Sequence, residues 1–190
     1  HRVEIGAGQV DFTTATVYKA TTTHLKDAAS VVNFSKANAL DLITNFTTET
    51  NGTGKIVVGN EERTFTGTIG TDANRIGELQ LTSNHTLKFN QVATKLYVNA
   101  ITTTTDKQGV VYITGNNSEI YANIGAEGKT FKALVLDGAA PITVKLTEGK
   151  SVFVDAVAGG VGLSAGNNQN NVLELYNNSA IIGRVSTASN

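Results

Sequence analysis

The sequence contains no cysteine, no methionine and no tryptophan, and it has one proline among its 190 residues. Without cysteine the chain cannot form disulfides, bind a metal through thiolates or use a cysteine nucleophile, which excludes several classes of enzyme. The absence of cysteine has two explanations. One is chance, and the other is export from a bacterium, where a protein must stay free of disulfides while it crosses a membrane.

Strong charge and long apolar runs are also missing. The formal net charge is −1 and the chain has no run of Lys or Arg, so neither nucleic acid nor an anionic membrane is expected as a partner. No stretch of about 18 apolar residues could span a bilayer, and residues 1–30 lack the basic start and apolar segment of a signal peptide. We therefore expect a mature segment or an excised fragment of a larger protein, with no membrane insertion by this segment.

Apolar residues make up 40% of the chain, enough for a packed core, and they alternate with polar ones. Stretches such as "KLYVNAI", "GVVYITG" and "SVFVDAV" have the period of two that is typical of β-strands, and Gly, Asn, Asp or Thr separates them. Only Asp27 to Ile43 offers a helical alternative, which Val31, Val32 and Phe34 weaken. The pattern predicts an all-β chain of short strands.

The chain also resembles itself. "FTGTIGTDANRIGELQL", from Phe65 to Leu81, has the same order of apolar residues and glycine as "IYANIGAEGKTFKALVL", from Ile120 to Leu136. The same shift pairs Gly54 with Gly109, and residues 172–185 resemble residues 110–124. We therefore divide a single segment, 1–190, into repeat units at 54–108 and 109–171 with partial copies at 1–53 and 172–190.

Internal repetition at this period is typical of solenoids, arrays and propellers. A propeller usually carries Trp and Asp landmarks, and this chain has no tryptophan. A β-solenoid coil takes roughly 20 to 30 residues, so a repeat of about 55 would be two coils. The prediction is a parallel β-helix of roughly seven or eight coils. An antiparallel β-sandwich array is the alternative.

The repeat carries a resemblance to a known family. "GTGKIVVGNEERTFTGTIGTDANRIGELQL", followed by "TLKFNQVATKLYVNAI", resembles the degenerate repeats of the rickettsial surface cell antigens, the outer membrane protein A and B group of autotransporters. The theme extends from about Val32 to Val157 and returns near the end.

This resemblance implies a non-enzymatic passenger segment, displayed on the bacterial surface, that contributes to adhesion to host cells, to their invasion and to the surface coat. The implied partners are a host cell-surface protein and the neighbouring coils of the full passenger. The implied location is the bacterial surface, through an outer-membrane barrel that this chain does not contain, or the extracellular medium after release.

A carbohydrate-active β-helix remains an alternative, and it needs two or three carboxylates close together. The densest charged cluster, Asn60–Arg63, aligns with a polar corner in the repeat, so we interpret it as a solvated turn. Asp72 aligns with Glu127, which favours a structural corner over a catalytic role. Six aspartates are expected mostly at corners or exposed strand positions: Asp11, Asp41, Asp72, Asp106, Asp137 and Asp155. No catalytic residue is predicted.

Neither a metal nor a cofactor is predicted. His1, His24 and His85 are isolated from any metal-ligand spacing and are expected at the surface. "AGGVGLSAG", residues 158–166, superficially resembles a phosphate loop, but no Lys-Ser/Thr follows it, and the calcium-binding nonapeptide is absent.

We interpret residues 158–171 as a flexible loop that interrupts the period and as the first place to seek partner contacts. The candidates there are Gly159, Gly160, Gly162, Asn167, Asn168, Gln169, Asn170 and Asn171.

Three hypotheses stand at this point: an adhesin-type passenger, a carbohydrate-active β-helix, and a purely structural spacer.

Asn-x-Ser/Thr triplets begin at six asparagines, which composition alone explains in a chain rich in Asn and Thr. They are Asn33, Asn45, Asn51, Asn84, Asn116 and Asn177.

Overall fold

A computed structural model describes residues 1–13, 17–35, 40–59, 61–137, 142–155, 163–164 and 171–186. These residues form strands and no helix, and every pairing between named strands is parallel. The expected all-β fold and parallel β-solenoid are confirmed. The segment that offered a helical alternative, Asp27 to Ile43, contains a strand at Ser30–Asn33 and the start of another at Leu40.

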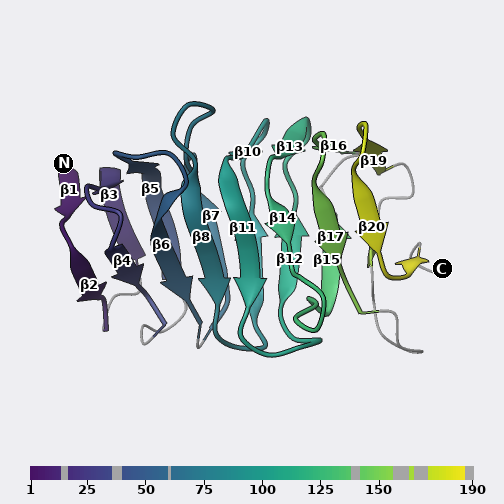
Figure 1. Ribbon diagram of the computed structural model, residues 1–190, viewed down its shortest axis with the longest axis horizontal. Coiled ribbons are helices and arrows are strands. Elements are labelled where there is room, and N and C mark those ends of the chain that lie inside the picture. The colour runs from purple at the N-terminus through teal and green to yellow at the C-terminus, as the bar shows by residue number, and fades with distance from the viewer. Residues whose placement is uncertain are drawn as a thin grey trace.

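Three sheets form the walls of the solenoid, whose strands stack from the N-terminal end to the C-terminal end in Figure 1. The first sheet, with nine described strands, consists of β1 (Arg2–Ile5), β3 (Val17–Leu25), β5 (Leu40–Thr48), β7 (Arg63–Thr66), β9 (Thr86–Phe89), β12 (Val110–Ile113), β15 (Ala133–Leu136), β18 (Leu163–Ser164) and β21 (Val185–Ser186). The second, with eight, consists of β2 (Gly8–Asp11), β4 (Ser30–Asn33), β6 (Thr53–Val58), β8 (Ile76–Leu81), β11 (Val98–Thr103), β14 (Asn123–Ile124), β17 (Ser151–Phe153) and β20 (Ala180–Ile182). The third, with four, consists of β10 (Lys95–Leu96), β13 (Ser118–Ile120), β16 (Thr143–Leu146) and β19 (Val172–Leu175).

From β9 onward, one coil runs through the nine-, four- and eight-stranded sheets in turn, whereas β1 to β8 alternate between the nine- and eight-stranded sheets. Ile56 pairs with Leu79, and Leu79 pairs with Ile101, so both coils have the length of roughly 20 to 30 residues that is typical of a β-solenoid. The coil that separates Ile124 from its partner Val152 is longer than these two. Parallel pairing of this kind lets the side chain at a given position of one coil stack on its equivalent in the next.

The expectation that the repeat equals two coils is wrong. Ile56 lies in β6 of the eight-stranded sheet, whereas Val111, its counterpart in the repeat, lies in β12 of the nine-stranded sheet. Likewise Phe65 lies in β7, and its counterpart Ile120 lies in β13 of the four-stranded sheet. The shift between the two repeat units therefore covers two coils and one further wall. It matches because every wall places the same pattern of apolar residues toward the core.

The core is a set of apolar rows along the interior. One row, from β4 to β17, is almost inaccessible to solvent and consists of Val32, Ile56, Leu79, Ile101, Ile124 and Val152. A second row, from β5 to β15, consists of Leu42, Phe65, Phe89, Ile113 and Leu136. Burial of these rows provides the main drive for stacking.

The corners use asparagine to join successive coils. In each case a side-chain oxygen of one coil accepts a hydrogen bond from a backbone N–H of the next coil, so a corner amide that the sheets leave unpaired is satisfied. The pairs are Asn45 with Thr68, Asn51 with Arg75, Asn84 with Gly109, Asn116 with Thr143 and Asn123 with Ser151. Four asparagines that begin Asn-x-Ser/Thr triplets thus have a structural role.

Candidate functional site

Most of the predicted contact residues lie outside the described residues: Gly159, Gly160, Gly162, Asn167, Asn168, Gln169 and Asn170 are not among them. The interpretation of residues 158–171 as a loop is wrong for Leu163–Ser164, which form β18 and pair with β15 and β21. Asn171 is described, and its amide joins two coils. Its oxygen accepts the backbone N–H of Ile142 at 2.9 Å, and its nitrogen donates to the carbonyl of Leu136 at 2.7 Å. The Asn171 side chain therefore holds the backbone of the preceding coil.

The interpretation of Asn60–Arg63 as a solvated turn is wrong for Arg63. Glu61 and Glu62 are exposed, but the Arg63 side chain is fully buried. Its guanidinium donates to the carbonyls of Phe34 at 3.2 Å and Gly59 at 2.6 Å. Burial lowers the pKa of Arg63, although the negative charge of Glu61 acts in the opposite direction.

The alternation along β7 explains this position. Phe65 points into the core, so Arg63, two residues earlier, points inward as well. The guanidinium satisfies corner carbonyls that belong to two different coils. Arg63 is therefore a structural link rather than a surface charge.

The histidines also differ from one another in burial. His1 and His85 are exposed, as predicted, whereas His24 is buried, so the surface assignment is wrong for His24. Its Nδ1 hydrogen-bonds with the hydroxyl of Thr47 at 2.9 Å, and its Nε2 lies 2.9 Å from the carboxylate of Glu49. Among the described residues, no group of three or more His, Asp or Glu side chains is placed to hold a metal ion.

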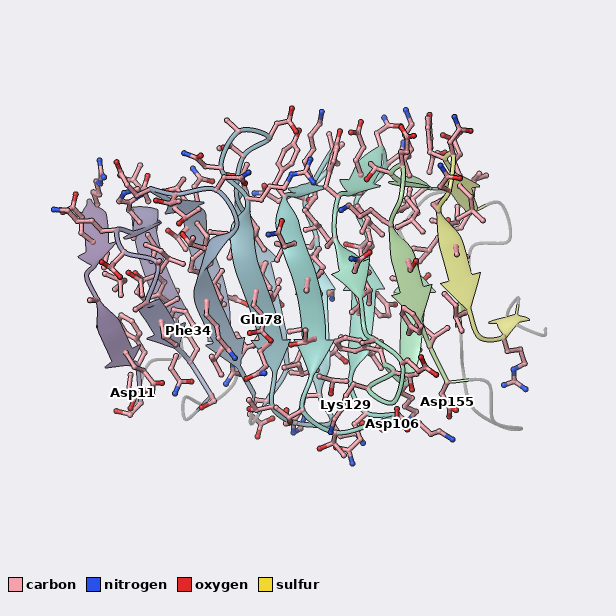
Figure 2. All side chains as sticks on the ribbon, in the orientation of Figure 1. Asp11, Phe34, Glu78, Asp106, Lys129 and Asp155 are labelled. Atoms are coloured by element: carbon pink, nitrogen blue, oxygen red, sulfur yellow. The ribbon has the colours of Figure 1, made fainter. Side chains whose placement is uncertain are left out.

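Several acids spread along the stack form links between coils. Figure 2 shows Asp11 toward the N-terminal end, Glu78 on β8, and Asp106 and Asp155 at the lower edge of the view. Asp106 accepts the backbone N–H of Thr130 at 2.8 Å, which lowers the pKa of Asp106.

Four further acids have similar partners. Asp11 accepts from Asn33, Asp137 from Tyr112 and Glu78 from Lys55, while Asp155 lies 3.7 Å from Lys107. Asp155 departs from the expectation for the aspartates, because it is largely buried.

A group of charged and aromatic side chains at the corner between the four- and eight-stranded sheets is the candidate functional site. This corner cluster consists of Asp72, Arg75, Lys95, Tyr97, Glu119 and Tyr121. Two of its members, Asp72 and Arg75, belong to the loop of residues 67–75, which joins β7 to β8 and rises at the upper edge of Figure 1. A groove of about 270 Å³ is lined by Thr68, Gly70, Thr71, Asp72, Ala93, Lys95 and Tyr97.

Local sequence fixes the shape of this loop. Gly70 has φ of 70°, and a Cβ there would lie 2.1 Å from the carbonyl oxygen of Tyr97, so the chain requires glycine. Thr71 and Asn74 close the tip through two hydrogen bonds, one from the backbone N–H of each residue, both of 3.0 Å. Asp72 and Arg75 form an ion pair of 3.4 Å across the same turn.

Two tyrosines from successive coils stack at the base of the loop. The ring centroids of Tyr97 and Tyr121 are 4.4 Å apart and the ring planes meet at 25°. The Tyr121 hydroxyl donates to Glu119, and this bond, together with burial, raises the pKa of Tyr121 well above 10.0. Arg75 lies over the Tyr121 ring at 5.5 Å.

The sequence interpretation missed this pair. Its only signal is the separation of Tyr97 and Tyr121 along the chain, which equals one coil.

Comparison with known protein families, with curated proteins and with solved structures gave no match. Within the described part of the chain, no helix is long and apolar enough to cross a membrane.

Proposed function

We propose that the chain is a non-enzymatic, surface-displayed passenger segment that contributes to bacterial adhesion to host cells, to their invasion and to the surface coat. The proposal rests on the resemblance of residues 52–101 to the rickettsial surface cell antigens, with which the parallel β-solenoid fold is compatible. On this proposal the anchoring barrel belongs to another part of the full protein, and the partner is a host cell-surface protein.

The observation that carries the proposal is how the polar side chains are used. The asparagines at the corners, the buried Arg63 and acids such as Asp106 and Glu78 all bond to neighbouring coils. These side chains link successive coils into a rod, and their polar groups find partners within the protein. A rod of this kind presents flat walls and corner loops at a distance from its anchor.

The experiment is a binding assay with cultured animal cells. Labelled chain 1–190 is added to the cells, unlabelled chain competes, and an unrelated β-helix passenger is the control. Saturable binding that unlabelled chain displaces is expected for an adhesin. Binding no stronger than that of the control would leave the spacer hypothesis and would assign adhesion to other parts of the full protein.

Two additions separate the remaining alternatives. A variant without residues 165–170, which keeps β18 and Asn171, tests the predicted contact loop, and its circular dichroism spectrum shows whether the solenoid is retained. Incubation with acidic polysaccharides, followed by chromatography of the products, tests the carbohydrate-active alternative. Shortened saccharides would contradict the non-enzymatic proposal.

A further inference from the structure

The composition of the chain leaves few side chains that oxidants attack. Cysteine, methionine and tryptophan are absent, so five tyrosines and three histidines are the main oxidisable residues. A one-electron oxidant that meets this protein therefore acts chiefly on tyrosine. The product of that oxidation depends on which tyrosines have a second tyrosine within reach.

Tyr97 and Tyr121 form the one stacked tyrosine pair in the described part of the chain, with ring centroids 4.4 Å apart. Both side chains are partly exposed at the corner, where a small radical or a peroxidase product can reach them. The strands that follow them, β11 and β14, are paired through Ala100 with Asn123, so neighbouring coils hold the two rings in place. Such fixed proximity replaces a bimolecular encounter with an intramolecular one.

The surroundings also provide an acceptor for the phenolic proton once the ring has lost an electron. The hydroxyl of Tyr121 donates to the carboxylate of Glu119. Loss of an electron makes a phenol strongly acidic, so an acceptor already in hydrogen-bond contact takes the proton without rearrangement. Lys95 lies 3.6 Å from the same carboxylate and keeps it at the corner.

We propose that Tyr97 and Tyr121 are an oxidative cross-linking site, at which the two rings join as dityrosine and tie one coil covalently to the next. Each phenol loses one electron and one proton. The two radicals form a carbon–carbon bond between ring positions ortho to the hydroxyls, and tautomerisation restores both phenols. The two electrons and two protons reduce one hydrogen peroxide, activated by a haem peroxidase, to two waters. This inference does not depend on the proposed function.

The other tyrosines provide matched controls. Tyr112 also donates to a carboxylate, that of Asp137, but its near neighbour is Lys88 rather than a second tyrosine. Tyr176 is 48% exposed and lies near Lys145. If a carboxylate acceptor or solvent exposure alone were enough for cross-linking, Tyr112 and Tyr176 would react as readily as the stacked pair.

The test treats the dilute chain with hydrogen peroxide and a haem peroxidase. The expected product is a monomer lighter by two hydrogen atoms, with blue dityrosine fluorescence that no tryptophan obscures. A peptide map should place the link between Tyr97 and Tyr121. Because the reaction is intramolecular, the fraction of cross-linked monomer should not change with protein concentration.

Variants complete the test. Tyr97→Phe and Tyr121→Phe should each lose the fluorescence of the monomer, whereas Tyr112→Phe and Tyr176→Phe should retain it. Glu119→Gln should slow the reaction while the rings remain stacked. Circular dichroism of every variant should show an intact solenoid, since phenylalanine keeps the aromatic ring and glutamine keeps the shape of glutamate. The proposal is overturned if the monomer gains no dityrosine, if Tyr97→Phe retains it, or if the product is a dimer whose yield rises with concentration.

Discussion

Replacement of Phe89 by alanine should strongly destabilise the middle of the solenoid. Phe89 lies in β9, is 1% exposed, and stacks on Phe65 of the preceding coil with ring centroids 5.2 Å apart. Its strand pairs with β7 on one side and β12 on the other. The alanine variant would leave a cavity between coils whose backbones are held by these pairings, so the surrounding structure can relax only partly. Removal of a buried phenylalanine side chain costs about 3–5 kcal/mol, and we expect Phe89→Ala to fall in this range.

Phe12→Ala is the matched control. Phe12 follows β2 in the first coil and stacks on Phe34 at 4.9 Å and 22°, much as Phe89 stacks on Phe65 at 23°. However, Phe12 is only partly buried and packs against one neighbouring coil. We expect a loss of about 1–2 kcal/mol, since less apolar area is removed from contact.

Urea unfolding followed by far-UV circular dichroism measures both variants. In a stack where each coil contacts only its neighbours, a weak central interface also reduces cooperativity, so Phe89→Ala should show a lower m-value or two transitions. Phe12→Ala should keep one transition. Equal losses in the two variants, or a loss below about 1 kcal/mol for Phe89→Ala, would refute the idea that packing between central coils holds the stack together.

Three further predictions concern the loop, a strand pair and the buried cation. Gly70→Ala should lower the free energy of unfolding by about 1–3 kcal/mol, because residue 70 has a positive φ and a Cβ there would meet the carbonyl of Tyr97. Gly128→Ala should cost less, because φ is 71° there but no atom lies within 4 Å of the added Cβ. Thermal melts compare the two variants. Burial would raise the pKa of Glu78, but hydrogen bonds from a threonine and a lysine outweigh burial and lower that pKa below 4.5. Its stabilising contribution is therefore complete above pH 4.5 and is lost as pH falls through the lowered pKa, so the melting temperatures of Glu78→Gln and the parent chain should converge in acid. Arg63→Met should cost about 2–4 kcal/mol in urea unfolding because buried carbonyls lose their donor, and unchanged stability would contradict this role.

The fold could be predicted from the sequence because apolar and polar residues alternate along its strands. Stretches such as residues 110–113 place every second side chain in the core. This pattern predicted the short strands, and the internal repeat predicted the solenoid. Residue type misled where a polar residue occupies an inward position. Arg63 and His24 were assigned to the surface from their chemistry, yet both are buried. Strand β7 turns Arg63 inward, whereas His24, between the core-facing Thr23 and Leu25, is buried beside Thr47 and Glu49 of the next coil. Their corner carbonyls, hydroxyls and carboxylate come from other coils, so no local pattern reveals them.

The corner cluster was missed for a different reason. The shift that pairs Gly54 with Gly109 gives a strong self-match because all three walls demand the same apolar pattern, but it moves each residue to a different wall. Contact requires a shift that returns to the same wall, and a shift of one coil brings Phe65 to Phe89 and Tyr97 to Tyr121. The same shift pairs Lys95 with Glu119, which are 3.6 Å apart. In a three-walled solenoid, the strongest internal repeat therefore identifies positions with equivalent packing, whereas the coil period identifies residues that touch and so could share chemistry.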